Sequence, residues 1–197
     1  MACSKFLALA LLGLSGSMVQ AVDFVNVSGS STRYATPIQS SVGDKRVNLV
    51  LTGTALRTKY LASVYAIGSY LQEGVSVRTP EELAVVNCAK CLHLVMERDV
   101  AGKDMAEAFR SAIRQNYAAP LFTDEINTMV ECIQAQDVHK GDQVWLIHVP
   151  NVGLHLNLVG KRDVLIRNAR FSQAVWDIYL GKNNFGESIK KDLVSRL

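Results

Sequence analysis

The cysteines are the residues whose type and spacing most readily suggest a chemical role. Cys88-Ala89-Lys90-Cys91 has the spacing of a thiol redox motif or of half a zinc site, and Cys132 stands alone. A thioredoxin-like motif opens a helix after a strand, whereas this one runs into a strand-like stretch at residues 91–96. We therefore predict that these cysteines are structural or incidental rather than catalytic.

Histidines offer the second set of candidate ligands, and they are dispersed. A c-type haem motif needs histidine directly after the second cysteine, where this chain has Leu92. A zinc site would need a second compact pair of ligands, which the spacing of the histidines does not provide. We therefore predict no metal and no cofactor. The four histidines are His93, His139, His148 and His155.

Residues 1–21 have the features of a secretory signal peptide. Lys5 supplies a positive charge, residues 6–14 are an apolar run too short to span a bilayer, and the segment ends Val19-Gln20-Ala21. We predict cleavage after Ala21, a mature domain at 22–197 without a transmembrane segment, and a periplasmic or secreted location. Oxidising conditions there leave open one disulfide among Cys88, Cys91 and Cys132.

The composition fits one globular domain. Hydrophobic residues make up 49% of the 197 residues and charged residues 20%, which is enough apolar material for a core without disulfides or metals. The net charge is only +3, and the basic residues are scattered. The sequence therefore does not predict a nucleic-acid partner.

The elements that must position any site come from hydrophobic periodicity. Strands are predicted at residues 25–28, 46–52, 90–98, 143–149, 154–159 and 163–167, and residues 57–71 form either one long strand or two strands with a break. Helices are predicted after Thr79-Pro80, at residues 102–117 and 123–136, from near Ser172 to Gly181, and at 187–197. This order predicts an α+β fold with a mainly antiparallel sheet and helices on one face.

Three stretches resemble the chalcone isomerase-like family, in the family's order. The first is LTGTALRTKY from Leu51, followed by VYAIGSYL from Val64, and the second is MERDVAGKDM from Met96. The third is FSQAVW from Phe171, with YLG from Tyr179 and SIKKDL from Ser188. The resemblance covers nearly the whole mature chain and is greatest to exported bacterial members. It implies an open-faced β-sandwich, a large antiparallel sheet under a layer of helices.

The resemblance also implies ligand-binding residues. Plant isomerases of the family use an arginine to hold the phenolate of a chalcone, and the fatty-acid-binding relatives use it to hold a carboxylate beside a tyrosine. These positions are Arg57 and Tyr65 here, with Lys59 and Arg98 as further candidates. Each has a structural alternative. Arg57 could extend from a strand end and cap a carboxylate, Tyr65 could be an ordinary core or sheet residue, and Lys59 and Arg98 could be solvated. Arg57 and Tyr65 can meet only if the chain turns between them, near residues 58–61.

Two positions depart from the isomerase pattern. The catalytic tyrosine of the isomerases falls at Met105, and their asparagine falls near Ala112, so neither position can handle a proton. The resemblance therefore implies an exported binding protein for a fatty acid or similar amphiphilic carboxylate, held between sheet and helices, with no catalytic residue. The alternative is a chalcone-isomerase-type intramolecular lyase acting on a phenolic enone.

Overall fold

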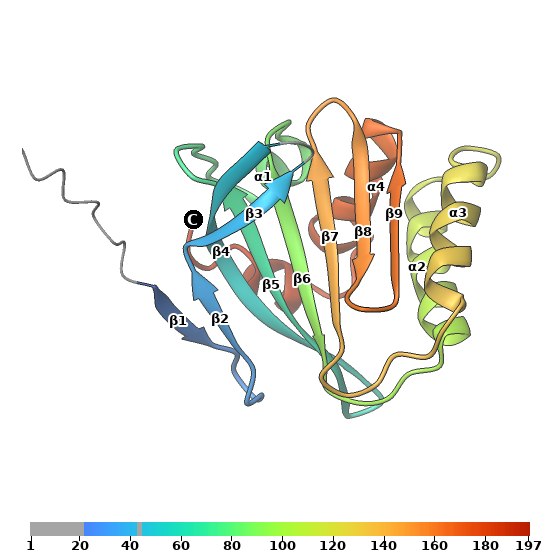
Figure 1. Ribbon diagram of the computed structural model, residues 1–197, viewed down its shortest axis with the longest axis horizontal. Coiled ribbons are helices and arrows are strands. Elements are labelled where there is room, and N and C mark those ends of the chain that lie inside the picture. Colours follow the sequence, from blue (N-terminus) through green and yellow to red (C-terminus); the bar gives the residue numbers. More distant parts are fainter. Residues whose placement is uncertain (1–21, 43–44) are drawn as a thin grey trace, which may run out of the picture.

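A computed structural model describes residues 22–42 and 45–197, so the predicted signal peptide lies outside the described residues. Figure 1 shows a strongly twisted sheet with the helices gathered on one side of it. The sheet has seven strands in the order β3-β4-β5-β6-β7-β8-β9, and every neighbouring pair is antiparallel. The predicted fold, an α+β open-faced sandwich, is confirmed.

The strands follow one another along the sheet in chain order, mostly through short turns. A separate two-stranded ribbon, β1-β2, precedes them. The strands are β1 Asp23–Asn26, β2 Arg33–Thr36, β3 Ile38–Val42, β4 Lys45–Lys59, β5 Ala62–Gln72, β6 Lys90–Met96, β7 Gln143–Val149, β8 Gly153–Leu158 and β9 Arg162–Ile166.

The helices supply the second layer through apolar faces that match their sequence periodicity. In α2, for example, Met105, Phe109 and Ile113 are buried in the core between sheet and helices. Among the described residues, no helix is long and apolar enough to cross a membrane. The helices are α1 Pro80–Val85, α2 Gly102–Asn116, α3 Thr123–Gln134, α4 Ala169–Leu180 and α5 Glu187–Asp192.

The opposite face of the sheet carries a second, smaller core. Tyr34 of β2 packs over Gly68 of β5, where an added Cβ would lie 2.9 Å from the tyrosine ring. The Tyr34 and Tyr70 hydroxyls donate to the carbonyls of His93 and Ala35, both at 3.0 Å. The N-terminal segment therefore covers part of the face that the helices leave open.

Three details differ from the sequence predictions. Strands β2 and β3 were not predicted, because their short stretches are polar and lack clear alternation. The fourth helix starts before the predicted position near Ser172: α4 begins at Ala169, and the Asn168 side chain accepts the capping hydrogen bond. The last helix ends at Asp192 and does not reach the end of the chain.

Candidate functional site

A cavity of about 830 Å³ opens between one end of the sheet and helix α2. Its size lies within the range of small-molecule sites. The sheet side includes Arg57, Tyr65 and Met96, and the helix side includes Met105 and Phe109. The cavity is therefore bounded by the two layers that the sequence predicted.

Arg57 and Tyr65 meet because residues 57–71 are interrupted by a tight turn. Strand β4 ends at Lys59 and β5 begins at Ala62, so Tyr60 and Leu61 form a two-residue hairpin turn. Arg57 pairs directly with Tyr65 across the hairpin. Of the two alternatives left open by the sequence, two strands with a break is the correct one.

An irregularity in the hairpin brings more of its side chains into the cavity. The register shifts between Arg57–Tyr65 and Thr58–Ser63, which leaves Val64 as an extra residue in β5. A β-bulge of this kind bends the strand and re-aims its side chains. Val64 and Tyr65, although adjacent, both line the cavity.

The guanidinium of Arg57 lies in an unusual environment, between aromatic rings and without a carboxylate partner among the described residues. Its Cζ lies 3.5 Å from the centroid of the Phe185 ring and 5.7 Å from that of Tyr65. No described residue forms a salt bridge with Arg57, and its Nη1 atom is buried with no hydrogen-bond partner in the described part of the chain. A buried donor on a fixed cation is costly unless an acceptor reaches it.

Tyr65 belongs to a buried pair of hydroxyls. Its Oη lies 3.0 Å from the Oη of Tyr179 on α4. Burial raises the pKa of Tyr65, although Arg57 and the Tyr179 hydrogen bond oppose this, and burial raises the pKa of Tyr179 well above its ordinary value. Both side chains are therefore neutral, and whichever hydroxyl accepts keeps its own hydrogen for a third group.

Lys59 and Arg98 also line the cavity, but at its exposed rim. The acidic residues of the lining are exposed as well. Among the charged residues that line the cavity, Arg57 is thus the one that is partly buried. The acidic lining residues are Asp99, Asp104 and Glu107.

The helix side of the cavity carries no group suited to proton transfer at the two family positions. Met105 and Ala112 are both buried and both line the cavity. Their neighbours Ala108 and Phe109 add further apolar surface. An aliphatic or aromatic ligand body could pack there, while an anionic group could reach Arg57 and Tyr65.

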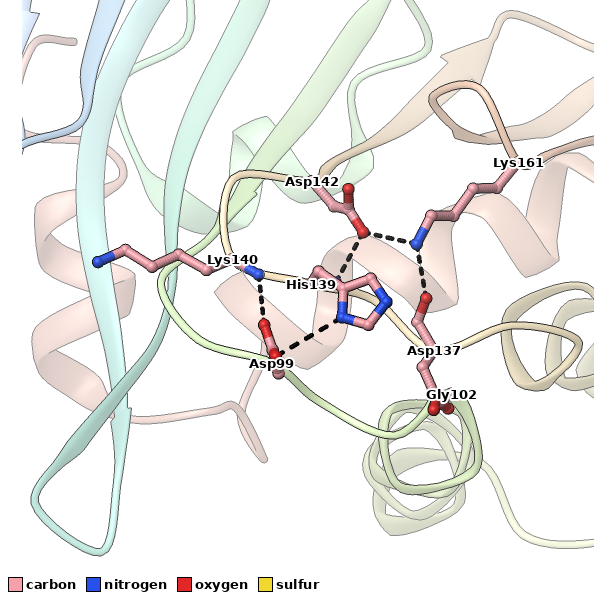
Figure 2. A network of polar contacts seen from close by, with 7 residues as sticks. All are labelled: Asp99, Gly102, Asp137, His139, Lys140, Asp142 and Lys161. Atoms are coloured by element: carbon pink, nitrogen blue, oxygen red, sulfur yellow. Dashed lines mark hydrogen bonds and ion pairs between the residues drawn. The ribbon is translucent and has the colours of Figure 1, made fainter.

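Figure 2 shows a polar network that joins three loops. One of its members, Asp99, also lines the cavity. The Asp99 carboxylate accepts a hydrogen bond from the Lys140 amide at 2.8 Å, and this bond lowers the pKa of Asp99. Lys161 Nζ contacts Asp142 Oδ2 at 2.6 Å. These contacts tie the loop after β6, which carries Asp99, to the loop before β7 and to the β8–β9 turn.

The cysteines and histidines do not converge. Cys88 belongs to the core under the helices and Cys91 to the core on the opposite face, and the thiols of Cys88, Cys91 and Cys132 are free. In the described part of the chain, no group of three or more His, Cys, Asp or Glu residues is placed to hold a metal ion.

Two aromatic residues of the site were not predicted from the sequence: Phe185, which lines the cavity, and Tyr179, which is hydrogen-bonded to Tyr65 behind it. Tyr179 lies in one of the stretches that carry the family resemblance, so its position held a usable signal. Phe185 follows α4 in the turn before α5, and its ring also contacts Phe109 and Tyr179. A single aromatic residue in a turn has no periodicity that would reveal this packing.

Comparison with known proteins places these features in a family. Among solved structures, the chain is similar to a fatty-acid binding protein of Arabidopsis thaliana, with a TM-score of 0.66 and 13% sequence identity. The similarity covers 87% of this chain and 96% of the plant protein. No curated protein matches the sequence. The sequence model of the chalcone isomerase-like family matches residues 31–195, and the chain therefore belongs to that family.

Proposed function

We propose that this protein is an exported binding protein for a fatty acid or a similar amphiphilic carboxylate. The observation that carries the proposal is the Arg57 guanidinium, which is partly buried in the cavity and has no carboxylate partner among the described residues. A ligand carboxylate would satisfy Nη1 and neutralise the charge. The fatty-acid-binding activity of the plant protein with the similar fold supports the same ligand class.

The cavity suits the two ends of such a ligand. The carboxylate would accept hydrogen bonds from Arg57 and from the Tyr65–Tyr179 hydroxyl pair, and the apolar chain would pack along Met105 and Phe109. The rim cations, Lys59 and Arg98, would face solvent and contribute less, because exposed charges are well screened.

The isomerase alternative receives less support from the lining. Ring closure of a chalcone needs proton transfer at the reacting ketone, and the family position for that task is Met105. The Tyr65 and Tyr179 hydroxyls are present, but their raised pKa values make them poor proton donors. We therefore favour a binding function over a catalytic one.

Native mass spectrometry of protein isolated from its own compartment tests the proposal. We expect a one-to-one complex with an acidic amphiphile, and the same stoichiometry when palmitate is added to delipidated protein. A copurified cationic ligand, or no complex with palmitate or with any aromatic carboxylate, would contradict the proposed function.

A further inference from the structure

The tip of the β4–β5 hairpin exposes two large apolar side chains. Tyr60 is 89% exposed and Leu61 is fully exposed, at 105% of the reference area. In Figure 1 the tip lies at the lower end of the molecule, beside the loops that follow β6 and precede β7. Tyr60 also lines the cavity, so the tip forms part of the cavity mouth.

The backbone conformation of the turn does not explain why tyrosine and leucine occupy it. Tyr60 and Leu61 have φ values of 50° and 63°, and a two-residue hairpin turn with positive φ at both positions strongly favours Asn-Gly. Bulky side chains are disfavoured in this backbone conformation. The apolar pair therefore lowers the stability of the turn. Lys59 Nζ lies 5.4 Å from the centroid of the Tyr60 ring, and at an exposed site this contact offsets only a small part of that cost.

Cations flank the tip. Lys59 precedes Tyr60, and Arg98 lies on the loop after β6, and both are exposed residues of the same cavity lining. Two of the acidic residues nearby are already engaged: Asp99 accepts a hydrogen bond from the Lys140 amide, and Glu107 forms an ion pair with Arg110. Asp104 lies in the first turn of α2, where the helix N-terminus offsets its charge.

We propose that the Tyr60–Leu61 tip inserts into the surface of a lipid bilayer that contains anionic lipid. Leucine would enter the acyl region, tyrosine would lie at the headgroup boundary, and Lys59 and Arg98 would contact the lipid phosphates. Two protruding side chains present far less surface than the roughly 800 Å² per partner of a stable protein interface. Together with the flanking cations, they would support weak, reversible attachment to a membrane surface.

This docking would turn the cavity mouth toward the bilayer, since Tyr60, Lys59 and Arg98 all belong to the cavity lining. An amphiphile could then pass between membrane and cavity with little exposure to water. The inference concerns the outer surface of the tip, and it stands whether or not Arg57 binds a carboxylate.

Cosedimentation with vesicles tests the inference. The key variant combines Tyr60→Asn with Leu61→Gly, which supplies the residues that the turn prefers. We expect it to bind vesicles of phosphatidylcholine and phosphatidylglycerol at least about tenfold more weakly than the wild type, with an equal or higher melting temperature. Equal binding by this variant and the wild type would overturn the proposal.

The cations are tested separately on the same vesicles at low ionic strength. Lys59→Gln and Arg98→Gln should each weaken binding about fivefold when phosphatidylglycerol is present, and should have no such effect on phosphatidylcholine alone. Unchanged binding would contradict the role of anionic lipid. If the wild-type protein remains in the supernatant with both kinds of vesicle, the membrane proposal is wrong and the tip would be assigned to a protein partner.

Discussion

At the scale of single residues, the proposed site centres on Arg57, whose guanidinium has no carboxylate partner among residues 22–42 and 45–197. Arg57 is stacked against Phe185 and bordered by two neutral tyrosines. An arginine that merely capped a strand end would reach solvent or a carboxylate, and Nη1 does neither in the described chain. This environment supports the proposal that Arg57 holds the anionic group of a ligand.

The tyrosine pair should contribute a neutral hydrogen bond to ligand binding. Tyr65→Phe should weaken palmitate binding about fivefold, since such a bond is worth roughly 1 kcal/mol. Tyr179→Phe should weaken it less, because Tyr65 would keep its own hydroxyl hydrogen for the ligand. Displacement of a fluorescent fatty acid measures both affinities. A larger loss for Tyr179→Phe would mean that Tyr179, and not Tyr65, contacts the carboxylate.

Met105 should make the protein a poor isomerase. Purified protein should not appreciably accelerate ring closure of a hydroxychalcone, because general acid–base catalysis contributes roughly 10²–10⁴-fold and the family position for it holds a thioether. Absorbance of the chalcone follows the reaction, with the uncatalysed rate as the reference. Rapid stereoselective closure would instead establish the isomerase alternative.

At the scale of elements, buried polar residues join the sheet to the helices. Lys90 of β6 is 1% exposed and donates to the carbonyls of Leu83 and Ala84 in α1, at 2.8 and 2.6 Å. His148 of β7 joins Ser172 of α4, with Nδ1 2.8 Å from the hydroxyl oxygen. These bonds fix short helices that could not persist alone.

The His148 link should make stability depend on pH. Burial lowers the pKa of His148 to about 4, and Lys90 adds to the effect. The unfolded chain takes up a proton near pH 6.5 while the folded chain does not. The free energy of unfolding should therefore fall as the pH drops from about 6.5 to about 4, by up to about 3 kcal/mol from this residue.

Chemical denaturation across this pH range measures the effect. His148→Gln should show a shallower dependence than the wild type, whatever its stability at neutral pH. His93 has its pKa lowered to about 4 by burial, so the double variant with His93→Gln should be shallower still. A wild-type slope retained in His148→Gln would show that other groups govern acid unfolding.

Most helices and strands could be predicted from the sequence, but not those features that depend on tertiary contacts. Helix α2 and strands β4 to β8 carry strong apolar periodicity, and the capping signal at Thr79 marks α1. Strand β3 is an edge strand with exposed polar residues, so its alternation is weak. Ser172 looks like a helix start because serine caps helices, yet here it serves the buried His148.

At the scale of the whole molecule, the family resemblance implied more of the site than local patterns could. One cavity is lined by the four predicted residues Arg57, Lys59, Tyr65 and Arg98. They could be identified only from the first two of the three stretches that resemble the family. The turn that joins Arg57 to Tyr65 could not be predicted from turn chemistry, because it contains Tyr60-Leu61 in place of Asn-Gly. Phe185 was missed because its contact depends on how α4 and α5 pack.

At the same scale, the proposed export makes a direct prediction about the first residue of the mature protein. The mature protein should begin at Val22, because Ala21 ends the cleavage pattern. Amino-terminal sequencing of protein from the envelope or secreted fraction would identify the first residue. Recovery of the protein in the cytoplasm with Met1 intact would remove the argument for an exported carrier.

The central claim is that Arg57 recognises a carboxylate, and the most direct measurement compares palmitate with its methyl ester by titration calorimetry. The wild type should prefer the acid by at least about tenfold, since each charge-assisted hydrogen bond is worth about 1.5–3 kcal/mol. Arg57→Gln should lose that preference, while Arg46→Gln, an exposed arginine on the same strand, should keep it. An equal affinity of the wild type for acid and ester, or a preference that survives in Arg57→Gln, would contradict the account.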